Sequence, residues 1–348
     1  MALLSCLQLD KNELDWQSTD WIERTLGIIR VGSAYESGIE GIPLQLVNMP
    51  LLGSDKGMVS DVWLAGGACR SGGQNGLSYR YNGHVLFAVL TLDEHLLTAL
   101  AGSLPLQRAT EQAYERLFRL LDEQGYPYLW RVWNYLADIN VEEGGLERYR
   151  QFNVGRQLAY EKCGRAVGGY ASAACALGTA AGPLTVAVMA GKTAPVLLEN
   201  PRQVRACDYP SVYGPRSPVF SRAALAKLPG QELLFISGTA SIVGHRTMHV
   251  GDVAAQTRET LANIAAVLQE ANRVAPGLPF TLSQLSYRTY IRHAADLDAV
   301  RAEVQRQVGG AQVQYVQADV CRSDLLVEIE AMASRTAEQQ DAAGVGVA

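Results

Sequence analysis

The amino-acid sequence predicts an α+β fold in which two units, each of order β-α-β-α-β-β, pack sheet to sheet as a pseudo-oligomer within one chain. Strand-like and helix-like segments recur in the same order in both halves, and such repetition indicates a duplicated architecture. The chain has 348 residues, of which 48% are hydrophobic and 19% charged. These values are typical of a globular protein with a substantial core.

The second half of the chain shows the unit most clearly. A strand is predicted over 232–241. The helix predicted over 252–271 carries Leu261, Ile264 and Leu268 at the spacing of one helix face. The other elements predicted in this half are a strand over 285–291, a helix over 296–306, and strands over 313–320 and 325–332.

The first half repeats this order. Its predicted elements are a strand over 85–91, a helix over 110–124, a strand over 129–136, a helix over 146–162, and strands over 170–177 and 184–190. Residues before these segments are expected to be β-rich with glycine-rich turns. We therefore divide the chain into a first unit with its N-terminal extension (1–198), a connector that contributes to the site (199–219), a second unit (220–335) and a flexible tail (336–348).

Charge and cysteine content exclude several classes of protein. A net charge of -5 provides no general attraction to nucleic acid or to anionic membranes, so neither is expected as a partner. The N-terminus lacks the basic segment of a signal peptide. The apolar run at 171–189 is interrupted by glycine and proline, which favours buried strands over a membrane span. The six cysteines include no C-x-x-C pair, which argues against a zinc site or a disulfide framework and for a cytoplasmic location.

Several strings resemble known families. The second unit is similar to a RidA (YjgF-like) domain in ISGTA at 236–240, in the helix at 253–263 and in the ending at 327–333. The whole chain resembles the chorismatases, which fuse two such units. The distinctive strings are RVWNY at 131–135, GLERYRQF at 145–152, VGR at 154–156, ENPRQV at 199–204, YGPRSP at 213–218 and ISGTASIVGH at 236–245.

This resemblance implies an enzyme that splits chorismate into pyruvate and 3-hydroxybenzoate, together with 4-hydroxybenzoate, without a metal or an organic cofactor. The reaction starts with protonation of the side-chain methylene of a dianion. It needs a positioned acid, a base for the ring proton, and cationic or hydroxyl groups that hold two carboxylates. A hydrolytic branch of the family instead adds water and releases a dihydroxycyclohexadiene carboxylate.

Glu328 is the first candidate for the acid. In the strand predicted over 325–332 its carboxylate and that of Glu330 point to the same face of the sheet, because strand side chains alternate. The corresponding run of the first unit, 186–189, has no carboxylate, which indicates one active site in the chain. Glu328 also matches the essential glutamate of the resembled family. The alternative for both residues is a solvent-facing edge position or a structural ion pair.

The same resemblance indicates two further active-site residues. Cys321 matches a cysteine of the branch that makes 3-hydroxybenzoate, where a thiol acts as proton donor near the methylene. Gly238 matches the small residue that leaves room for the ring in that branch. From the residues alone, a strand cysteine is more often a small core side chain and a strand glycine is equally natural at a bulge.

The expected carboxylate-binding groups are arginines and tyrosines. The guanidinium groups can form bidentate hydrogen bonds with carboxylates, and the phenols add donors. The candidates are Arg156, Tyr209, Tyr213, Arg216 and Arg301. Helical arginines are often simply solvated, which is the alternative for Arg301. His245 and His249 are four residues apart in a predicted loop without a third ligand nearby, so we do not interpret them as a metal site.

Two rival functions remain open. A RidA-like imine deaminase carries its carboxylate-binding arginine about fifteen residues before the final glutamate strand, and that place falls near Val313, where no basic residue stands. A metabolite-binding protein without turnover is the non-enzyme alternative, and Glu328 argues against it.

Because fusion of two units can replace an oligomer interface, a monomer is favoured.

Overall fold

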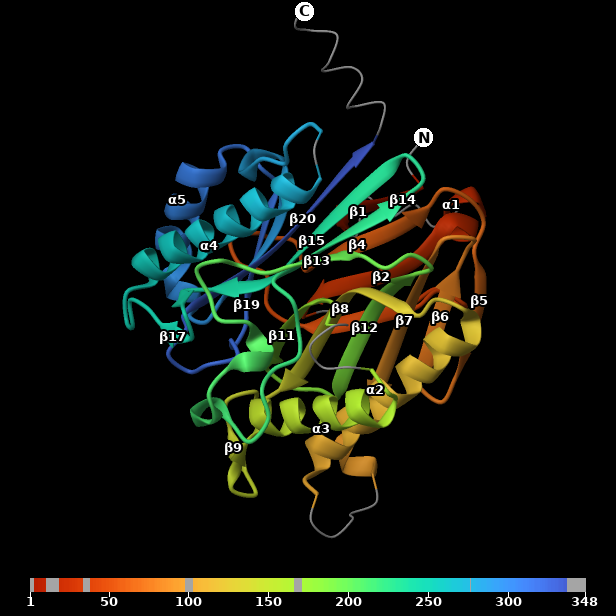
Figure 1. Cartoon of the computed structure of the whole chain (residues 1–348), viewed down its shortest axis with the longest axis horizontal. Helices are drawn as coiled ribbons and strands as arrows, with labels where there is room; N and C mark the ends of the chain where they lie inside the picture. The colour runs from red at the N-terminus through yellow and green to blue at the C-terminus, as the bar shows by residue number, and fades with distance from the viewer. Residues whose placement is uncertain are drawn as a thin grey trace, which may run out of the picture.

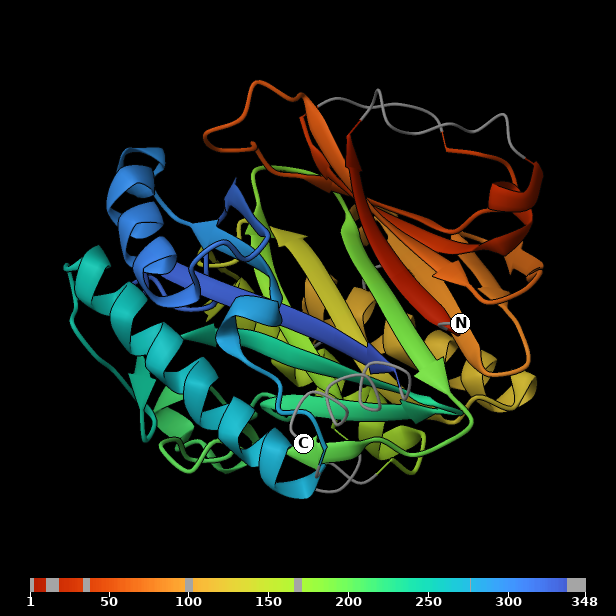
Figure 2. The same cartoon turned by 90° about the horizontal axis from the view of Figure 1, so that it is seen from above.

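The computed structural model describes residues 3–10, 19–33, 38–97, 103–165, 171–275 and 277–336. Three β-sheets surround a common centre, and the long helices lie on the outside of two of them (Figures 1 and 2). Residues 337–348, and with them nearly all of the predicted tail, lie outside the described residues. Within the described part, no helix has the length and apolar character that crossing a membrane requires.

The first unit contains a six-stranded sheet of order β11-β8-β12-β7-β6-β5. β8 and β11 are parallel, and the other neighbours are antiparallel. Its elements are β5 (Arg70–Gln74), β6 (Leu77–Tyr81), β7 (Val85–Leu92), α2 (Pro105–Gln124), β8 (Tyr128–Ala137), the short pair β9 (Glu142–Glu143) and β10 (Leu146–Glu147), α3 (Arg148–Lys162), β11 (Ala173–Thr179) and β12 (Leu184–Gly191).

The second unit has the same topology, with sheet order β19-β18-β20-β15-β14-β13 and a parallel pair formed by β18 and β19. Its elements are β13 (Val196–Leu198), β14 (Ala223–Leu228), β15 (Gln231–Ala240), the short pair β16 (Ile242–Val243) and β17 (Arg246–Thr247), α4 (Val253–Val274), β18 (Ser286–Ile291), α5 (Leu297–Val308), β19 (Val313–Gln317) and β20 (Val327–Thr336). The predicted duplication is therefore confirmed.

The N-terminal segment forms the third sheet, of order β1-β4-β2-β3. The parallel pair β2–β3, and the antiparallel pairs β2–β4 and β1–β4, match those of β18, β19, β20 and β15. The described residues between β2 and β3 contain no helix equivalent to α5. This sheet is a reduced third copy of the unit, built from β1 (Leu4–Asp10), α1 (Thr19–Arg24), β2 (Thr25–Gly32), β3 (Leu44–Asn48) and β4 (Met58–Ala65).

Several predicted boundaries differ from the structure. β5 and β6 complete the first sheet although they precede the predicted repeat, and β13, placed in the first unit by prediction, pairs with β14 of the second. β11 begins at Ala173, and Tyr170, the predicted start of that strand, lies outside the described residues. The prediction missed β5 because its sequence, RSGGQ, lacks the apolar alternation that marks a strand.

The inner faces of the three sheets meet in one apolar core. Large aromatic side chains from all three sheets meet in this core. The ring of Trp63 from β4 lies 6.0 Å from that of Trp133 on β8 and 6.0 Å from that of Phe235 on β15. Aromatic pairs at this separation bury much apolar area. Burial of these side chains therefore holds the three copies together.

Three positions beside this core correspond by strand register. Asp61 on β4, Met189 on β12 and Glu330 on β20 each lie opposite a residue of the neighbouring strand in the same copy. Those opposite residues are, respectively, Ile29, Arg131 and Arg288. The three sets are thus equivalent places in the three copies.

Interactions across the copies close these positions into a ring. Oδ2 of Asp61 lies 2.6 Å from Nη2 of Arg288, and Glu330 pairs with Arg131. In each case the acid of one copy meets the arginine of the next. At the third of these positions the equivalent side chains, Ile29 and Met189, are apolar, and both are buried in the central core. Two corners are therefore ionic and one is apolar.

Candidate active site

A β-bulge shapes the inner face of the second sheet. Ile236 pairs with Ala331 and Thr239 with Ile329, so two residues, Ser237 and Gly238, lie opposite one residue of β20. An extra residue of this kind bends the strand and redirects its side chains. A Cβ atom at Gly238 would overlap Oε1 of Glu328. The glycine therefore provides the space in which the Glu328 carboxyl group lies.

A pocket of about 310 Å³ opens in front of this carboxyl group. Its walls come from β15, β20 and the loop before β20, from α3 of the first unit, and from the connector before β14. The volume falls within the range of small-molecule sites. A deeper recess of about 30 Å³ shares five of its lining residues, namely Tyr149, Phe220, Gly238, Cys321 and Glu328.

Glu328 is 4% exposed, so it is not a solvent-facing edge residue. Burial, and next the charge of Glu330, raise the pKa of Glu328 to about 8, while Arg131 opposes the shift. A carboxyl group with this pKa is largely protonated at neutral pH. It can therefore donate a proton to a bound molecule, which an ordinary surface glutamate cannot do.

Two thiols lie beside this acid. Cys321, from the loop before β20, lines both the pocket and its recess. Burial, and next the charge of Glu328, raise its pKa to about 12, so the thiol keeps its proton. Cys175 on β11 lines the recess, and burial raises its pKa as well. Sequence reasoning missed Cys175, because no local pattern shows that β11 faces β20.

Arg156 lies in the recess, on the inner side of α3. It is 2% exposed, and its Nη2 donates to Oδ1 of Asn153 at 2.8 Å. Its guanidinium group lies 4.8 Å from the Phe152 ring centroid. No hydrogen-bond acceptor for its Nε exists among the residues that the structure describes. This end of the site can therefore provide one further donor to an anion.

The outer part of the pocket contains a second group of cations and phenols. The guanidinium of Arg322 lies 4.0 Å from the Tyr213 ring centroid and 5.3 Å from that of Tyr209. Nη2 of Arg222 donates to the Tyr209 hydroxyl at 3.0 Å. The Tyr213 hydroxyl donates to the carbonyl of His245 at 2.6 Å. His245 thus helps to hold the connector.

Sequence reasoning missed Arg222 and Arg322, and also Tyr149 and Arg150 of α3, which line the pocket. One signal was available. Arg322 directly follows Cys321, and therefore had to lie near any site that contains this thiol. The other three lie far from the second unit's final strands in sequence. Arg222 directly precedes β14, and Tyr149 and Arg150 reach the pocket only because α3 of the first unit packs against the second.

Two predicted carboxylate-binding residues are not brought to this pocket. Arg216 is exposed and forms an ion pair with Glu161, with its Nη1 3.1 Å from Oε1. Arg301 on α5 lines a separate groove against the N-terminal sheet, where its guanidinium group lies 5.5 Å from the Tyr315 ring centroid. In this structure Arg216 therefore lies on the surface, and Arg301 lies in the separate groove.

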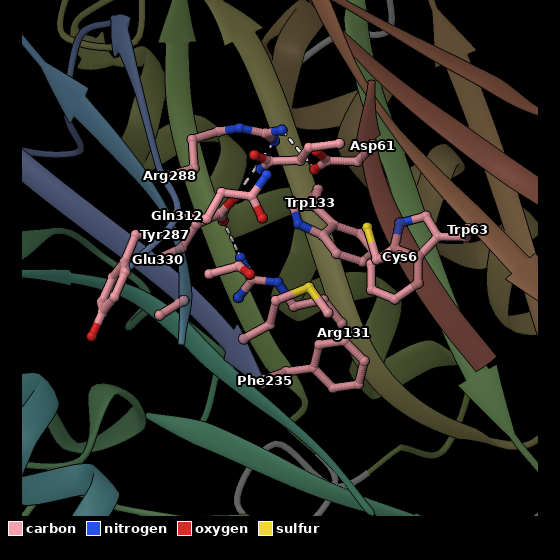
Figure 3. Close-up of a pocket in the computed structure, with 14 residues that line it drawn as sticks. Cys6, Asp61, Trp63, Arg131, Trp133, Phe235, Tyr287, Arg288, Gln312 and Glu330 are labelled. Atoms are coloured by element: carbon pink, nitrogen blue, oxygen red, sulfur yellow. Dashed lines mark hydrogen bonds and ion pairs between the residues drawn. The ribbon is translucent and has the colours of Figure 1, made fainter. Parts of the chain in front are cut away.

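Glu330 does not reach the pocket either. It lines a cavity at the junction of the three sheets (Figure 3), where it is paired with Arg131 and accepts a hydrogen bond from the Tyr290 hydroxyl at 2.9 Å. This cavity has a volume of only about 60 Å³, which is far below the size of small-molecule sites. For Glu330, therefore, the alternative of a structural ion pair describes the observed contacts.

Comparisons with known proteins agree with this arrangement. A family profile described as "Chorismatase FkbO/Hyg5-like, N-terminal" matches residues 61–190. A 3-hydroxybenzoate synthase of Streptomyces hygroscopicus is 36% identical over 324 residues, covering 88% of this chain and 90% of that protein. A chorismatase of Streptomyces rapamycinicus is 37% identical over 321 residues, covering 89% and 93%, respectively.

A solved structure is also similar over nearly its whole length. The crystal structure of a chorismatase superposes with a TM-score of 0.84 at 34% sequence identity, covering 95% of this chain and 98% of that one. Sequence identity and fold thus agree over most of the chain. The chain belongs to the chorismatase family.

Proposed function

We propose that this protein cleaves chorismate into pyruvate and 3-hydroxybenzoate, with 4-hydroxybenzoate as a second aromatic product, in the pocket around Glu328. The observation that carries the proposal is a buried carboxyl group, with a pKa raised to about 8, at the wall of a pocket of about 310 Å³. Enzymes tune glutamates to this range when they act as general acids near neutral pH.

The chemistry needs one proton donor and one proton acceptor. Protonation of the side-chain methylene gives an oxocarbenium ion. The ring 4-hydroxyl oxygen then bonds to the adjacent ring carbon and displaces pyruvate from it. The bond between this oxygen and C4 breaks as the proton on that adjacent carbon is lost, which gives 3-hydroxybenzoate. Atoms balance without water, because the two products together have the formula of chorismate. The proton that is lost from the ring replaces the one that was added, so Glu328 can return to its starting state.

The charges around the pocket suit a substrate with two carboxylates. Arg156 is in the recess, and Arg222 and Arg322 are in the outer part. Charge-assisted hydrogen bonds to carboxylates are roughly twice as strong as neutral ones. We propose that these separated cations hold the two carboxylates, with Tyr209 and Tyr213 supporting the outer pair through the contacts described above.

Cys321 and Gly238 favour the rearrangement over the hydrolytic reaction of the family. The protonated Cys321 thiol lines the same recess as Glu328 and is available as a donor near the methylene. Gly238 leaves the space that the carboxyl group occupies. A larger residue at that position would displace the acid and change where the ring lies.

We also propose that the protein acts as a monomer in the cytoplasm. The chain itself supplies three sheets around one core, so a second chain is not needed to bury their inner faces. All six cysteines are free, as expected in a reducing compartment. Sedimentation velocity at several concentrations tests the first part, because a dimer would sediment faster as concentration rises.

The experiment that tests the activity is incubation of the purified protein with chorismate, followed by chromatography of the products. Pyruvate with 3-hydroxybenzoate, lost in Glu328→Gln, is the expected result. Diversion of Cys321→Ala to the dihydroxycyclohexadiene carboxylate would support the thiol as a donor in the rearrangement. If the wild-type protein itself makes that compound, the hydrolytic reaction is the correct one. If no variant releases pyruvate, the proposed activity is wrong.

A further inference from the structure

A second concave site lies between the second unit and the N-terminal sheet. It is a groove of about 500 Å³ whose walls come from the ends of β1 and β4, the loop at 51–56, α5 and β19. Its lining is largely polar and includes several amide side chains. It shares no lining residue with the pocket around Glu328.

The three-copy architecture relates this groove to the active-site pocket. Glu328 lies two residues before Glu330 on β20, and Val59 lies two residues before Asp61 on β4. Since Glu330 and Asp61 correspond by register, Val59 occupies the place of Glu328. Val59 lines the groove as Glu328 lines the pocket.

The opposite walls correspond as well. The pocket and its recess are lined by α3 and β11 of the first unit, and the groove by α5 and β19 of the second. An isolated antiparallel β-bridge joins each pair of copies, between β11 and the loop before β20 in one pair and between the loop before β4 and β19 in the other. The amide of Gly178, in β11, donates to the loop before β20 at the carbonyl of Asp319, 2.7 Å away. The amide of Leu52, in the loop before β4, donates to the carbonyl of Tyr315 in β19, 2.9 Å away.

At the third equivalent interface the corresponding residues are packed into the central core. Ala187 of β12 occupies the place of Glu328 there, because it lies two residues before Met189. It faces the N-terminal copy, in which no described helix corresponds to α3 or α5. Ala187 and Val47 of β3 are both buried in the central core. Thus two of the three related interfaces keep an open site.

Hydrogen-bond donors remain in the groove although the acid is gone. Arg301 projects from α5 as Arg156 does from α3, and its guanidinium is one-third exposed. A Cβ atom at Gly53 would overlap Nη2 of Arg301, so the loop lies directly against this group. The nearest acidic partner among the described residues, Asp298, is 3.8 Å away and 95% exposed, a weak interaction in water.

Two buried groups on β19, the edge strand that lines the groove, also lack partners. Gln314 is 8% exposed, and neither its Nε2 nor the hydroxyl of Tyr315 has a hydrogen-bond partner among the described residues. Both residues line the groove. A buried donor without a partner destabilises the folded state. An acceptor-rich ligand would relieve this cost and would at the same time meet the Arg301 guanidinium.

We propose that this groove is a second binding site, which takes up a small carboxylate anion without converting it. The arginine, the amide and the phenol supply donors that match a carboxylate. Val59, which stands where the active-site pocket has its acid, has no proton to donate. Binding is therefore separated from chemistry at this interface.

The test uses 3-fluorobenzoate as a probe and follows its bound state by fluorine NMR and calorimetry. Binding measurements are independent of chorismate cleavage, so their outcome does not depend on the proposed activity. We expect two binding events on the wild-type protein. Arg301→Met should weaken one by at least about tenfold and leave the other, whereas Arg156→Met should do the reverse.

Controls separate recognition from folding. Arg301→Lys keeps the charge but lacks the planar fork, and should show intermediate affinity with an unchanged melting temperature. Neutral 3-fluorobenzamide should not occupy the groove, because it lacks the anionic oxygens. A single binding event that is lost in Arg156→Met and unaffected by Arg301→Met would overturn the proposal. Equal binding of the amide and the acid at the Arg301-dependent site would do so too.

Discussion

The carboxyl group of Glu328 lies in the space that Gly238 leaves by having no side chain, and a Cβ atom there would also come within 3.2 Å of Cβ of Cys175. The bulge in β15 creates this contact, because it places two residues opposite one residue of β20. The position of the acid is thus set by the backbone of a neighbouring strand as well as by its own.

The first prediction concerns that contact. Gly238→Ala should lower kcat by about 100-fold, because a displacement of order 1 Å at the reacting groups has this effect, while the melting temperature changes little. Steady-state kinetics with chorismate measures the loss. Gly83→Ala is the matched control, since no atom lies within 4 Å of the Cβ that it adds. Equal activity of the two variants would contradict the importance of the contact.

The second prediction is the pH dependence of the reaction. If Glu328 acts as an acid with a pKa of about 8, kcat/KM is retained below pH 8 and falls about tenfold per pH unit above it. A profile measured from pH 6 to 10 tests this. In Cys321→Ala the fall in kcat/KM should still begin near pH 8, because it reports the ionisation of the Glu328 carboxyl group. An activity that rises through pH 8 would show that the ionised form is the active one.

The third prediction links the same pKa to stability. The folded state binds a proton at Glu328 more tightly than the unfolded state does, so its contribution to stability is present below the usual glutamate pKa and is lost as pH rises through about 8. Glu328→Gln removes this loss. Between pH 5 and pH 9 the unfolding free energy of the variant, relative to that of the wild type, should therefore rise by about 4 kcal/mol. Urea denaturation at both pH values measures it, and a pH-independent difference would exclude the raised pKa.

The fourth prediction uses the ring of three copies. Glu330→Met leaves Arg131 buried without its partner and should destabilise the protein by about 3–5 kcal/mol. The double variant Arg131→Ile, Glu330→Met reproduces the third corner, where Ile29 and Met189 stand at the corresponding places. It should be less destabilised than either single variant, as measured by a double-mutant cycle in urea. Additive losses would mean that the ion pair is not replaceable by apolar packing.

The fifth prediction compares an arginine that lines the pocket with one that the sequence favoured but that lies outside it. Arg322→Met removes a guanidinium that lines the pocket and should raise the KM for chorismate by about 10–100-fold. Arg216→Met removes an exposed partner of Glu161 and should leave KM within about twofold, because surface ion pairs contribute little. A larger KM effect for Arg216 than for Arg322 would restore the original expectation from sequence.

Local patterns were sufficient for much of the fold. The helices predicted over 110–124 and 252–271 correspond to α2 and α4, and the strand predicted over 232–241 corresponds to β15. Apolar periodicity is a property of consecutive residues, so it survives without knowledge of partners. The N-terminal copy escaped notice because it has no described helix equivalent to α5, which leaves little periodicity to recognise.

The candidate site divides in the same way. Glu328 was found from strand alternation and from the lack of a carboxylate in the first unit, with support from the family resemblance. Cys321 and Gly238 were found through that resemblance, and the structure brings all three to one pocket. Arg216 and Arg301 were chosen for their residue type within such strings or on a helix, and residue type does not tell which way a side chain points.

The sequence by itself determined the order of helices and strands in two units, the family to which the strings point, and an acid on the last strand of only one unit. Only the tertiary structure decided that a third copy closes the core, that Glu328 is buried and neutral, and that Arg322 rather than Arg216 reaches the pocket. The physical reason is distance along the chain. Burial, pKa and pocket walls depend on segments far apart in sequence that meet only after folding.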